Sequence, residues 1–387
     1  MRVLHIGLLR FASAISWHAV MMAKALQERG HFCWVAGHPG SPLVALAARE
    51  GLQVPAALGF PELRPWNWGH VVGKLRRFLI DQRVDRLIVH TGSGHLEAHL
   101  ARRGLGIPLV RVRADARVPR ADLPHRWLYL HGCDRLVVSG AYMLDRHLAP
   151  IGISRERVSV LPPGIDLSET TWRPDAGRQQ AREDIRHQYQ IPGGVPLFGV
   201  IGRLSPVKGH QTLIEAAGRL AAEGRDFRLF IVGAEEEVTI EELRALGRRL
   251  GIEERLVFTG HVEDPLFYAA AFDFGVIPSL GSEAISRSAL EFMAVGVPVV
   301  ASLVGILPEV VSEDELLVPP GRPDSLAETL GRLLDDLPHA GRLGERAFRR
   351  VQRHFSLERL GEALEQLLEE TPARPRAAQR AHAGTHE

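Results

Sequence analysis

The chain has 387 residues, of which 45% are hydrophobic and 24% are charged, so a globular protein with two apolar cores is expected. Its two cysteines, Cys33 and Cys133, exclude a disulfide framework and a four-ligand zinc site, and they favour a reducing, cytoplasmic compartment. The longest apolar stretch, 294–307, is broken by glycine and proline and is shorter than the roughly 20 residues of a transmembrane helix.

Charge is distributed unevenly along the chain, although the net charge is only +1. Residues 1–190 carry 26 Lys and Arg against 16 Asp and Glu, whereas the remainder carries 21 against 30. A basic half favours an anionic partner, such as phosphate, an acidic glycolipid or the inner face of the cytoplasmic membrane, and no nucleic acid is expected. The alternative is that arginine is simply abundant in the proteins of the source organism.

The first half of the chain alternates short β-branched runs with longer helical patterns. Helices are expected over 18–29 and 71–82. Strand, helix and strand at this spacing predict right-handed βαβ units and a parallel sheet. The expected strands cover residues 3–7, 33–36, 86–90, 108–112, 135–138 and 158–161.

The second half repeats this plan. Its expected strands cover residues 197–201, 228–232, 255–259, 274–277, 297–301 and 315–318. The expected helices cover residues 211–223, 238–250, 286–295 and 323–334. The whole pattern predicts an α/β protein with two Rossmann-like domains, whose doubly wound parallel sheets face each other across a cleft. Ligands are expected in that cleft, at the carboxyl ends of the strands.

Proline and glycine residues between the two halves indicate the domain boundary. We expect residues 1–163 to form the acceptor-binding domain and 164–355 the nucleotide-binding domain, with a helix over about 356–370 packing back on the first domain. A polar stretch that runs to about Gly194 fits an interdomain connection. Residues 371–387 have almost no apolar content and are expected to be disordered.

One local pattern that fits phosphate chemistry is EAISRSALE, at residues 283–291. A helix that begins near Ser286 would leave its first backbone N–H groups free to bind phosphate. Glu283 would stand in the loop before this helix, and Glu291 would lie one turn inside it, where a carboxylate can bind a ribose diol. One carboxylate for each of two sugars, with phosphate between them, is the geometry that a nucleotide sugar needs. The alternative is a capped surface helix with two solvated glutamates.

A second pattern, GRLSPVKG at residues 202–209, also follows an expected strand and precedes a helix. The turn at Gly202 and the cations Arg203 and Lys208 can hold a diphosphate, with the guanidinium as a fork and the ammonium as a point charge. The sequence is neither a Walker A loop nor a GxGxxG dinucleotide fingerprint. The alternative is that these cations are ordinary surface residues near the end of a strand.

Together, these patterns resemble the retaining glycosyltransferases of family 4, which have the GT-B fold. The matching segments are the Glu-x7-Glu spacing of Glu283 and Glu291, the 202–209 loop, FMAVGVPVV at 292–300, LPEVV at 307–311 and LPPGID at 161–166. The family implies transfer of a sugar from a nucleotide sugar, here a UDP-sugar, to a hydroxyl of a glycolipid or glycan. It also implies no metal and no other cofactor, because cations and the helix terminus balance the charge of the diphosphate.

The same resemblance assigns roles to individual residues. Arg203 and Lys208 would bind the donor diphosphate and stabilise it as the leaving group. Glu291 would hold the ribose, and Glu283 would contact the hydroxyls of the donor sugar. Further donor contacts would come from Gly202, Val262, Ala284, Ile285 and Ser286, although Ala284 and Ser286 replace the family's usual glycine and proline.

In the first half, HTGS at 90–93 and PLVRVR at 108–113 resemble a subgroup that builds lipopolysaccharide core and other surface glycans. Many of these enzymes place a catalytically important histidine directly after the second arginine, where this chain has Ala114. Asp115 is the candidate catalytic replacement, and a different acceptor is the alternative. The expected acceptor-binding residues are Ser13, His90, Thr91, Arg111, Arg113 and Arg117.

Arginines dominate the expected acceptor side. Arg111 and Arg113 lie two apart on a strand and therefore share a face. With Arg117 and Arg120 they can grip an anionic acceptor. The alternative is that Arg111 lines an edge of the sheet with its charge in solvent.

His95 and His99 lie four apart on an expected helix and invite a metal hypothesis. The glutamate of an HExxH motif is not in place between them. A solvated helix face is expected instead, and no metal site is predicted.

The segment FPELRPWNW at 60–68, followed by Lys74, Arg76, Arg77 and Phe78, combines aromatic and cationic side chains. This composition suits an interfacial contact with anionic lipid. The alternative is a loop that packs its tryptophans onto the domain.

The expected reaction begins when the donor binds to the second half and the basic first half closes over it with the acceptor. Departure of the diphosphate builds negative charge, which the cations and the helix terminus balance. The acceptor hydroxyl then attacks from the same face, as the resemblance implies. A sugar-nucleotide epimerase on the same fold and a non-catalytic nucleotide-sugar-binding protein are the alternatives.

Overall fold

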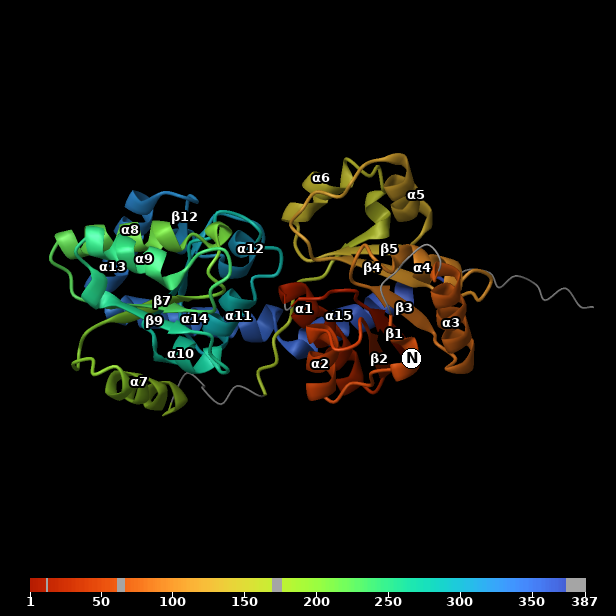
Figure 1. Cartoon of the computed structure of the whole chain (residues 1–387), viewed down its shortest axis with the longest axis horizontal. Coiled ribbons are helices and arrows are strands. Elements are labelled where there is room, and N and C mark those ends of the chain that lie inside the picture. Colours follow the sequence, from red (N-terminus) through yellow and green to blue (C-terminus); the bar gives the residue numbers. More distant parts are fainter. Residues whose placement is uncertain (12, 61–66, 169–175, 374–387) are drawn as a thin grey trace, which may run out of the picture.

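The computed structural model describes residues 1–11, 13–60, 67–168 and 176–373. Within them, each half of the chain forms a six-stranded sheet whose paired strands are all parallel. Figure 1 shows two α/β units side by side, with helices on both faces of each sheet. The predicted pair of doubly wound α/β domains is therefore confirmed.

The first sheet has the strand order β2-β1-β3-β4-β5-β6. Its strands are β1 (Arg2–Ile6), β2 (Phe32–Ala36), β3 (Arg86–Val89), β4 (Leu109–Arg113), β5 (Arg135–Val138) and β6 (Val158–Val160). The helices of this unit are α1 (Ala14–Glu28), α2 (Pro42–Arg49), η1 (Ala56–Leu58), α3 (Trp68–Asp81), α4 (His95–Ala101), α5 (Leu123–His131), α6 (Tyr142–Leu148) and η2 (Arg155–Arg157).

The second sheet has the strand order β12-β11-β10-β7-β8-β9. Its strands are β7 (Leu197–Ile201), β8 (Arg228–Val232), β9 (Leu256–Gly260), β10 (Phe274–Ile277), β11 (Val299–Ser302) and β12 (Leu317–Val318). The helices are α7 (Ala176–Gln188), η3 (Pro206–Lys208), α8 (His210–Ala222), α9 (Ile240–Arg249), η4 (Glu253–Arg255), α10 (Pro265–Ala271), α11 (Arg287–Ala294), α12 (Leu307–Val311), η5 (Asp314–Leu316), α13 (Pro323–Asp335) and α14 (Leu337–His354).

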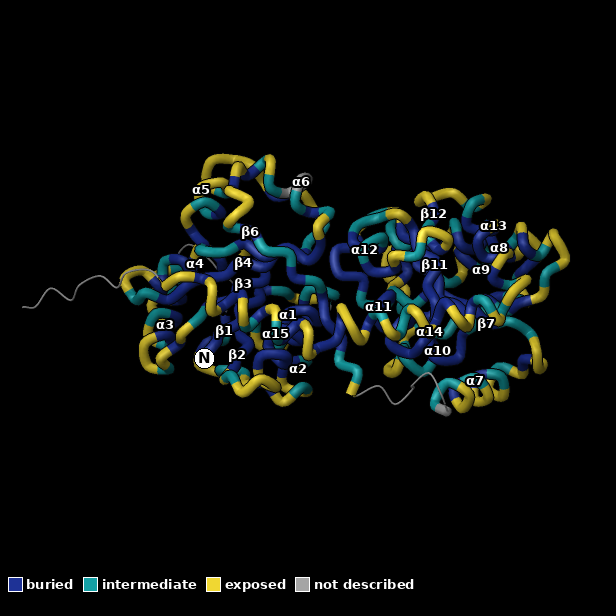
Figure 2. The backbone as a smooth tube through the Cα atoms, turned by 180° about the vertical axis from the view of Figure 1, so that it is seen from behind, coloured by how far each residue is buried: buried dark blue, intermediate teal, exposed yellow. Residues whose placement is uncertain are grey.

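Central strands of both sheets are covered on both faces, which explains why they are continuous apolar runs rather than alternating ones. Leu136, Val137 and Val138 of β5 are fully buried, as are Leu229 and Phe230 of β8. Figure 2 shows this buried interior running through both units, with the exposed residues on the outer helices and loops. None of the helices in the described part of the chain combines the length and the apolar character of a membrane span.

The chain crosses between the two units twice, and the crossings lie side by side. The N–H of Ile165 donates to the carbonyl of Phe355 at 2.7 Å, and the N–H of Leu357 donates to the carbonyl of Ile165 at 2.9 Å. These paired segments form the covalent hinge between the units.

After the second crossing, helix α15 (Leu357–Glu370) returns to the first unit and packs against α1. Gly361 makes this close approach possible, because a Cβ there would lie 2.9 Å from the carbonyl oxygen of Ala25. His31 and Arg29 both pair with Glu365 of α15. The last described helix is therefore part of the first unit in space, and the expected disordered tail lies, from residue 374 on, outside the described residues.

One expectation about the connection is wrong. Part of the polar stretch that runs to Gly194 is helix α7, which packs against α10. The Arg178 guanidinium donates to the carbonyls of Ala270, Gly296 and Phe272, at 3.2, 3.0 and 2.7 Å. Hydrogen bonds from arginine, rather than a wide apolar stripe, attach this helix to the second unit.

Candidate active site

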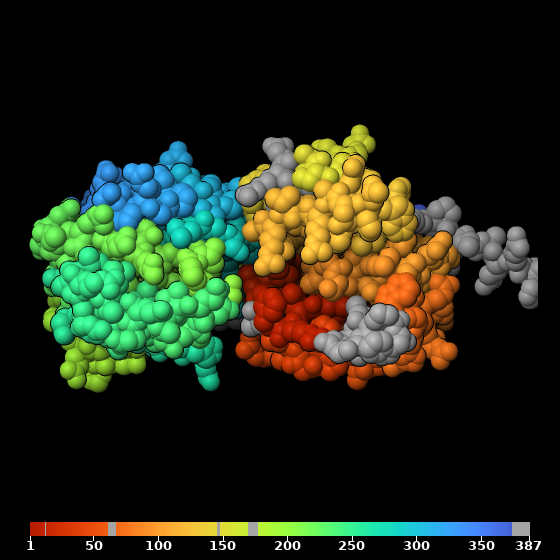
Figure 3. Space-filling view, turned by 45° about the horizontal axis from the view of Figure 1, so that its top comes forward, coloured from red at the N-terminus to blue at the C-terminus, as the bar shows by residue number. Residues whose placement is uncertain are grey.

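Each sheet reverses its strand order at one point. The reversal lies between β7 and β10 in the second sheet and between β1 and β3 in the first. Ligands of open α/β sheets bind beyond the carboxyl ends of the strands at such points. Figure 3 shows the molecular surface hollowed where the two halves meet.

The loops that follow β7 and β10 meet through an ion pair. Lys208 Nζ lies 2.6 Å from Glu283 Oε1, and the Ser279 hydroxyl donates to the same oxygen at 2.7 Å. The Glu283 side chain is 2% exposed, whereas that of Lys208 is 23% exposed. The carboxylate is therefore fixed from inside the protein, while the ammonium group still reaches solvent.

Two glycines permit the close approach of these loops. Gly209 has a φ of +71°, and a Cβ there would lie 2.0 Å from the carbonyl oxygen of Pro278. Gly305 has a φ of +58°, and a Cβ there would lie 2.0 Å from the carbonyl oxygen of Glu283, which accepts the N–H of Ile306 at 2.8 Å. The backbone on both sides of the ion pair is thus held in one position.

Helix α11 begins directly after the Glu283 loop. Its N-cap residue, Ser286, has left-handed backbone angles, with φ of 50° and ψ of 60°. The Ser286 hydroxyl is buried and has no hydrogen-bond partner among the described residues. The first amides of a helix also lack partners within the helix, so this terminus offers several donors to an oxyanion such as phosphate.

Glu291 lies one turn inside α11, as the sequence predicts. It is buried, and the Arg287 Nε donates to its Oε1 at 2.7 Å. Burial raises the pKa of Glu291 above its ordinary value, although the positive charge of Arg287 opposes this shift. Arg287 also stacks over the ring of Trp17 in α1, with 5.5 Å between the guanidinium carbon and the ring centroid, so this part of the site touches the first unit.

Arg203 has a different partner from the one its motif suggests. Its guanidinium bonds to both carboxylate oxygens of Glu236 at 2.6 Å, and its side chain is 51% exposed. The structure therefore brings Lys208 and Glu283 into direct contact, whereas Arg203 lies in an exposed ion pair. The sequence does not predict this pairing, because Glu236 follows β8 and belongs to no recognised motif.

The other expected donor residues lie around the same loops. Gly202 donates its N–H to the carbonyl of Val232 at 2.9 Å at the end of β7. Ala284 and Ile285 are buried within the Glu283 loop, and Val262 is half-buried beyond β9. The carboxyl end of the second sheet thus carries all of the donor residues expected from the sequence.

Three expected acceptor residues, Ser13, His90 and Thr91, follow β1 and β3 of the first unit. Ser13 caps α1 and accepts the N–H of Ser16 at 3.2 Å. The Thr91 hydroxyl accepts the N–H of Leu8 at 3.0 Å and donates to the Ser93 carbonyl at 2.7 Å. The Ser13 and Thr91 hydroxyls therefore hold the loops at the switch point of the first sheet, where its strand order reverses.

His90 is buried beside a second histidine. The ring nitrogens of His5 and His90 lie 3.1 Å apart, and the two rings are stacked with centroids at 5.3 Å. Burial lowers the pKa of His90 well below its ordinary value, and the charges of His5, His18 and Arg111 add to this effect. The neutral imidazole is therefore the stable form in the folded chain.

Arg111 and Arg113 lie inside the first unit, contrary to the expectation of an acceptor grip or a charge in solvent. The Arg111 guanidinium donates to the carbonyl of Val89 at 3.0 Å and also to that of Val112. Arg113 donates to the Tyr129 hydroxyl at 2.7 Å and to a backbone carbonyl. Because β4 is an inner strand and α5 supplies Tyr129, both cations serve internal hydrogen bonds.

Asp115 and Arg117 lie on the surface beyond β4, where the expected acceptor side begins. Asp115 Oδ1 accepts the N–H of Arg117 at 2.9 Å. Arg117 and Arg120 are exposed, and Ala114 is buried. The carboxylate of Asp115 therefore directly follows the buried Ala114, and its catalytic role stays a prediction.

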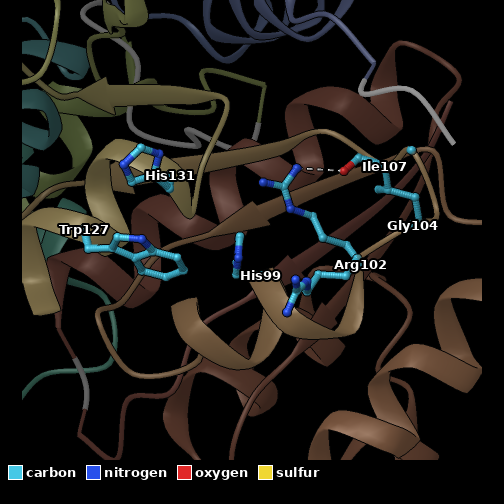
Figure 4. A pocket seen from close by; sticks show the side chains of 8 residues that line it. His99, Arg102, Gly104, Ile107, Trp127 and His131 are labelled. Carbon is cyan, nitrogen blue, oxygen red and sulfur yellow. Dashed lines mark hydrogen bonds between the residues drawn. The ribbon is translucent and has the colours of Figure 1, made fainter. Parts of the chain in front are cut away.

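His95 and His99 correct a further expectation, because both are buried rather than solvated. His95 packs edge-on against Tyr129, and His99 lies edge-on to Trp127 with ring centroids 5.5 Å apart. Helix α5 covers this face of α4. A pocket lined by His99, Arg102, Trp127 and His131 lies beside it, away from the ion pair of the second unit (Figure 4).

The aromatic and basic segment after Phe60 lies mainly at residues 61–66, outside the described residues. Phe60 itself is buried, and the Trp68 indole N–H donates to Glu97 at 2.9 Å. Contact of this segment with anionic lipid remains a prediction.

Two family models match the two halves of the chain. Residues 15–169 match the model described as Glycosyltransferase Family 4, and residues 195–336 match Glycosyl transferases group 1. The second match includes the Lys208 and Glu283 loops and α11. The first includes most of α1 and the loop at His90 that follows β3.

Individual proteins give the same family. The MMP alpha-(1->4)-mannosyltransferase of Mycolicibacterium hassiacum is 31% identical over 336 residues, which cover 79% of this chain and 75% of that protein. The D-inositol 3-phosphate glycosyltransferase of Corynebacterium efficiens is 35% identical over 209 residues, so the chain spans only 48% of that relative. The crystal structure of Anabaena HepE in complex with UDP superposes with a TM-score of 0.80 at 20% identity and covers 95% of this chain and 100% of that one, which shows the same fold.

Proposed function

The chain belongs to glycosyltransferase family 4, and on that premise we propose that it is a retaining glycosyltransferase that uses a UDP-sugar donor. The acceptor we propose is a hydroxyl of an anionic glycolipid or glycan in the synthesis of lipopolysaccharide or another cell-surface polysaccharide. The reaction takes place in the cytoplasm, at the inner face of the membrane. A single observation carries the proposal: the Lys208–Glu283 ion pair stands beside the N-terminus of α11 at the strand-order reversal of the second sheet.

The donor diphosphate is the ligand that this arrangement fits best. Its negative charge would be balanced by Lys208 and by the free amides of α11, and the unpartnered Ser286 hydroxyl adds a further donor. Glu291 lies one turn farther along the helix, and we assign its carboxylate to the ribose of the nucleotide. The UDP in HepE supports uridine as the base.

Glu283 is the group we assign to the donor sugar. Its Oε1 already accepts from Lys208 and Ser279, which orients the carboxylate and leaves Oε2 for a sugar hydroxyl. The same ion pair keeps the ammonium group close to the bond that breaks. Lys208 therefore connects the two ends of the donor, the sugar and the leaving diphosphate.

The reaction needs charge stabilisation more than proton transfer in its first step. As the bond between the anomeric carbon and the diphosphate lengthens, negative charge grows on the phosphate oxygens, where Lys208 and the α11 amides stabilise it. The acceptor hydroxyl then attacks the oxocarbenium-like sugar from the face that the diphosphate leaves, and its proton passes to the departing phosphate oxygen. The configuration at the anomeric carbon is retained.

No metal ion is part of the proposed mechanism. The described residues offer cations and helix amides at the place where other nucleotide-sugar enzymes use Mg²⁺. Transfer measured in excess EDTA should therefore equal transfer measured with added Mg²⁺. A requirement for Mg²⁺ would remove this part of the proposal.

Donor choice is tested by thermal denaturation with UDP-, GDP- and ADP-glucose. A ligand that binds only the folded chain at 100 times its Kd adds about 2.7 kcal/mol to the free energy of unfolding. We expect UDP-glucose to raise the Tm of the wild type by several degrees and to leave the Lys208→Met variant nearly unchanged. Equal shifts in both proteins, or none with any nucleotide sugar, would contradict the donor assignment.

Transfer itself is tested with radiolabelled UDP-sugar and a mixture of anionic glycolipids. The proposal predicts label in the lipid fraction only when acceptor is present. Conversion of the donor alone into an isomeric sugar nucleotide would identify an epimerase instead. Donor binding without either product would identify a binding protein.

A further inference from the structure

We propose that Glu309 is a positioning residue that clasps the two units together and ties the first unit to the loop that carries Glu283. Glu309 lies in α12 of the second unit. Its Oε2 accepts the N–H of Ala141 at 2.8 Å, and its Oε1 accepts the N–H of Tyr142 at 2.7 Å. Both amides belong to the turn between β5 and α6 of the first unit.

The geometry of this contact is that of a helix cap supplied from another domain. Ala141 is the N-cap residue of α6, and Tyr142 is the first residue of that helix, so neither amide has a carbonyl partner within the helix. A side-chain carboxylate that accepts two such amides is favoured by its charge and by the helix dipole. In this chain the capping carboxylate comes from the other side of the cleft.

A second contact joins the same turn to the donor loop itself. The buried Ser139 hydroxyl donates to the carbonyl of Ala284 at 2.5 Å. Ala284 directly follows Glu283 in the chain. One short turn, residues 139–142, therefore touches both the donor loop and α12.

Gly140 shows how closely the units approach at this turn. A Cβ at this position would lie 3.0 Å from Ile306 Cγ1 and 3.1 Å from Glu309 Oε1. Both of these atoms belong to the second unit. A side chain at 140 would therefore require these two atoms, and Tyr142 Cδ1 at 2.9 Å, to shift.

Helix α12 also connects the clasp to Glu283 within the second unit. Ile306, directly before α12, donates its N–H to the Glu283 carbonyl at 2.8 Å. At the other end of α12, the Arg350 guanidinium donates to the carbonyls of Glu309 and Val310, at 2.7 and 2.8 Å. Helix α12 is held at both ends. A movement of the first unit that displaces Glu309 should therefore also displace the Glu283 loop.

The consequence for turnover rests on the proposed function, whereas the clasp itself does not. Nucleotide binding uses residues of the second unit, and so it should survive the loss of Glu309. Transfer needs both units in one relative position, because donor and acceptor come from opposite sides of the cleft. Loss of the clasp should therefore lower kcat much more than it weakens UDP binding.

The decisive variant is Glu309→Ala, with Glu313→Ala as its matched control. Glu313 lies just after α12. It pairs with Arg346, a residue of its own unit, at 3.3 Å. Small-angle scattering of the ligand-free proteins reports the separation of the units. We expect a larger radius of gyration for Glu309→Ala and an unchanged one for Glu313→Ala.

Kinetics and binding complete the test on the same proteins. We expect Glu309→Ala to lose about tenfold or more in kcat for sugar transfer, while its Kd for UDP, measured by calorimetry, stays within about twofold of the wild-type value. Gly140→Ala should reproduce both the scattering change and the loss of kcat, and it replaces Glu309→Ala if that variant does not fold. Unchanged scattering and unchanged kcat in these variants would overturn the clasp. Wild-type protein that does not bind UDP would instead overturn the proposed donor, and the scattering comparison would still decide the clasp.

Discussion

The two halves of the molecule share one topology but use their polar residues in opposite ways. In both sheets the strand order reverses at the strand that begins the half, β1 or β7. In the second half, the charged groups of the switch point, Lys208 and Glu283, meet on loops at the cleft. In the first half, Arg111 and His90 lie beneath the surface and bond to the chain itself.

This difference shows that a fold does not decide which of its polar residues face a ligand. The strand-end loops of the second half expose backbone amides and an ammonium group, which suits a small anionic ligand. The first half instead has exposed cations beyond β4, such as Arg117 and Arg120.

The largest expected effect comes from breaking the ion pair of the second half. Glu283→Gln removes the negative charge but keeps an acceptor for Ser279, so the fold should tolerate it. We expect kcat for sugar transfer to fall about 100- to 1,000-fold, as it does when one charge-stabilising group is removed from an active site. Steady-state kinetics measure the loss, and a Tm within a few degrees of the wild type shows that the fold remains.

The opposite result is expected in the first half. Arg111→Ala leaves the carbonyls of Val89 and Val112 without the guanidinium that bonds to them. Each buried group that loses its partner costs about 1–3 kcal/mol, so the free energy of unfolding should fall by about 2–6 kcal/mol. Urea denaturation measures this loss. If the variant kept its stability but bound the acceptor less tightly, Arg111 would be an acceptor-binding residue after all.

Acid should destabilise the first half through its buried histidines. Burial lowers the pKa of His5 to about 3 and that of His18 to about 4, from an ordinary value of 6.5. Between pH 6.5 and these values the unfolded chain binds protons that the folded chain does not, so stability falls as the pH falls. Each such histidine lowers the free energy of unfolding by about 1.4 kcal/mol per pH unit in this window.

His18→Met isolates one of these contributions. Urea denaturation between about pH 4.5 and 6 should give a pH slope that is smaller by about 1.4 kcal/mol per unit in the variant. An identical slope would mean that His18 is protonated in the folded chain.

The smallest expected effect concerns Arg203. Its guanidinium forms an exposed ion pair with Glu236, and exposed pairs of this kind contribute at most about 1 kcal/mol. Glu236→Gln should free Arg203 for the donor diphosphate and tighten UDP binding by about two- to threefold. Calorimetry with UDP measures the change. Weaker binding in this variant would show that Glu236 itself supports the site.

The sequence predicts the sheets better than the surfaces. The strands 135–138, 197–201, 228–232 and 274–277 have both ends where the pattern places them, because short β-branched runs end in polar residues or glycine. Helix α7 was not predicted, since Ala181 and Ile185 are the only buried residues over 177–188, the part of the helix whose burial is described. Its attachment through Arg178 depends on carbonyls that lie 92 to 118 residues away in the sequence, which no local pattern reveals.

Some contacts of the site could likewise be predicted from the sequence, and others could not. The contact of Lys208 with Glu283 was predictable, because each follows a strand that neighbours the other at the switch point. The burial of Arg111 was not, since an alternating charged strand also fits an exposed face, and the cover comes from Tyr129 in a later helix. The Glu309 clasp likewise needs two domains in place before the carboxylate meets its amides.

The most direct test of the account is a crystal structure of the chain with UDP. In the proposed site, Lys208 and the N-terminus of α11 bind the diphosphate at the strand-order reversal of the second sheet. We expect diphosphate oxygens within hydrogen-bonding distance of Lys208 Nζ and of the first α11 amides, with the ribose against Glu291. UDP bound elsewhere on the chain, with the Lys208–Glu283 pair untouched, would contradict it.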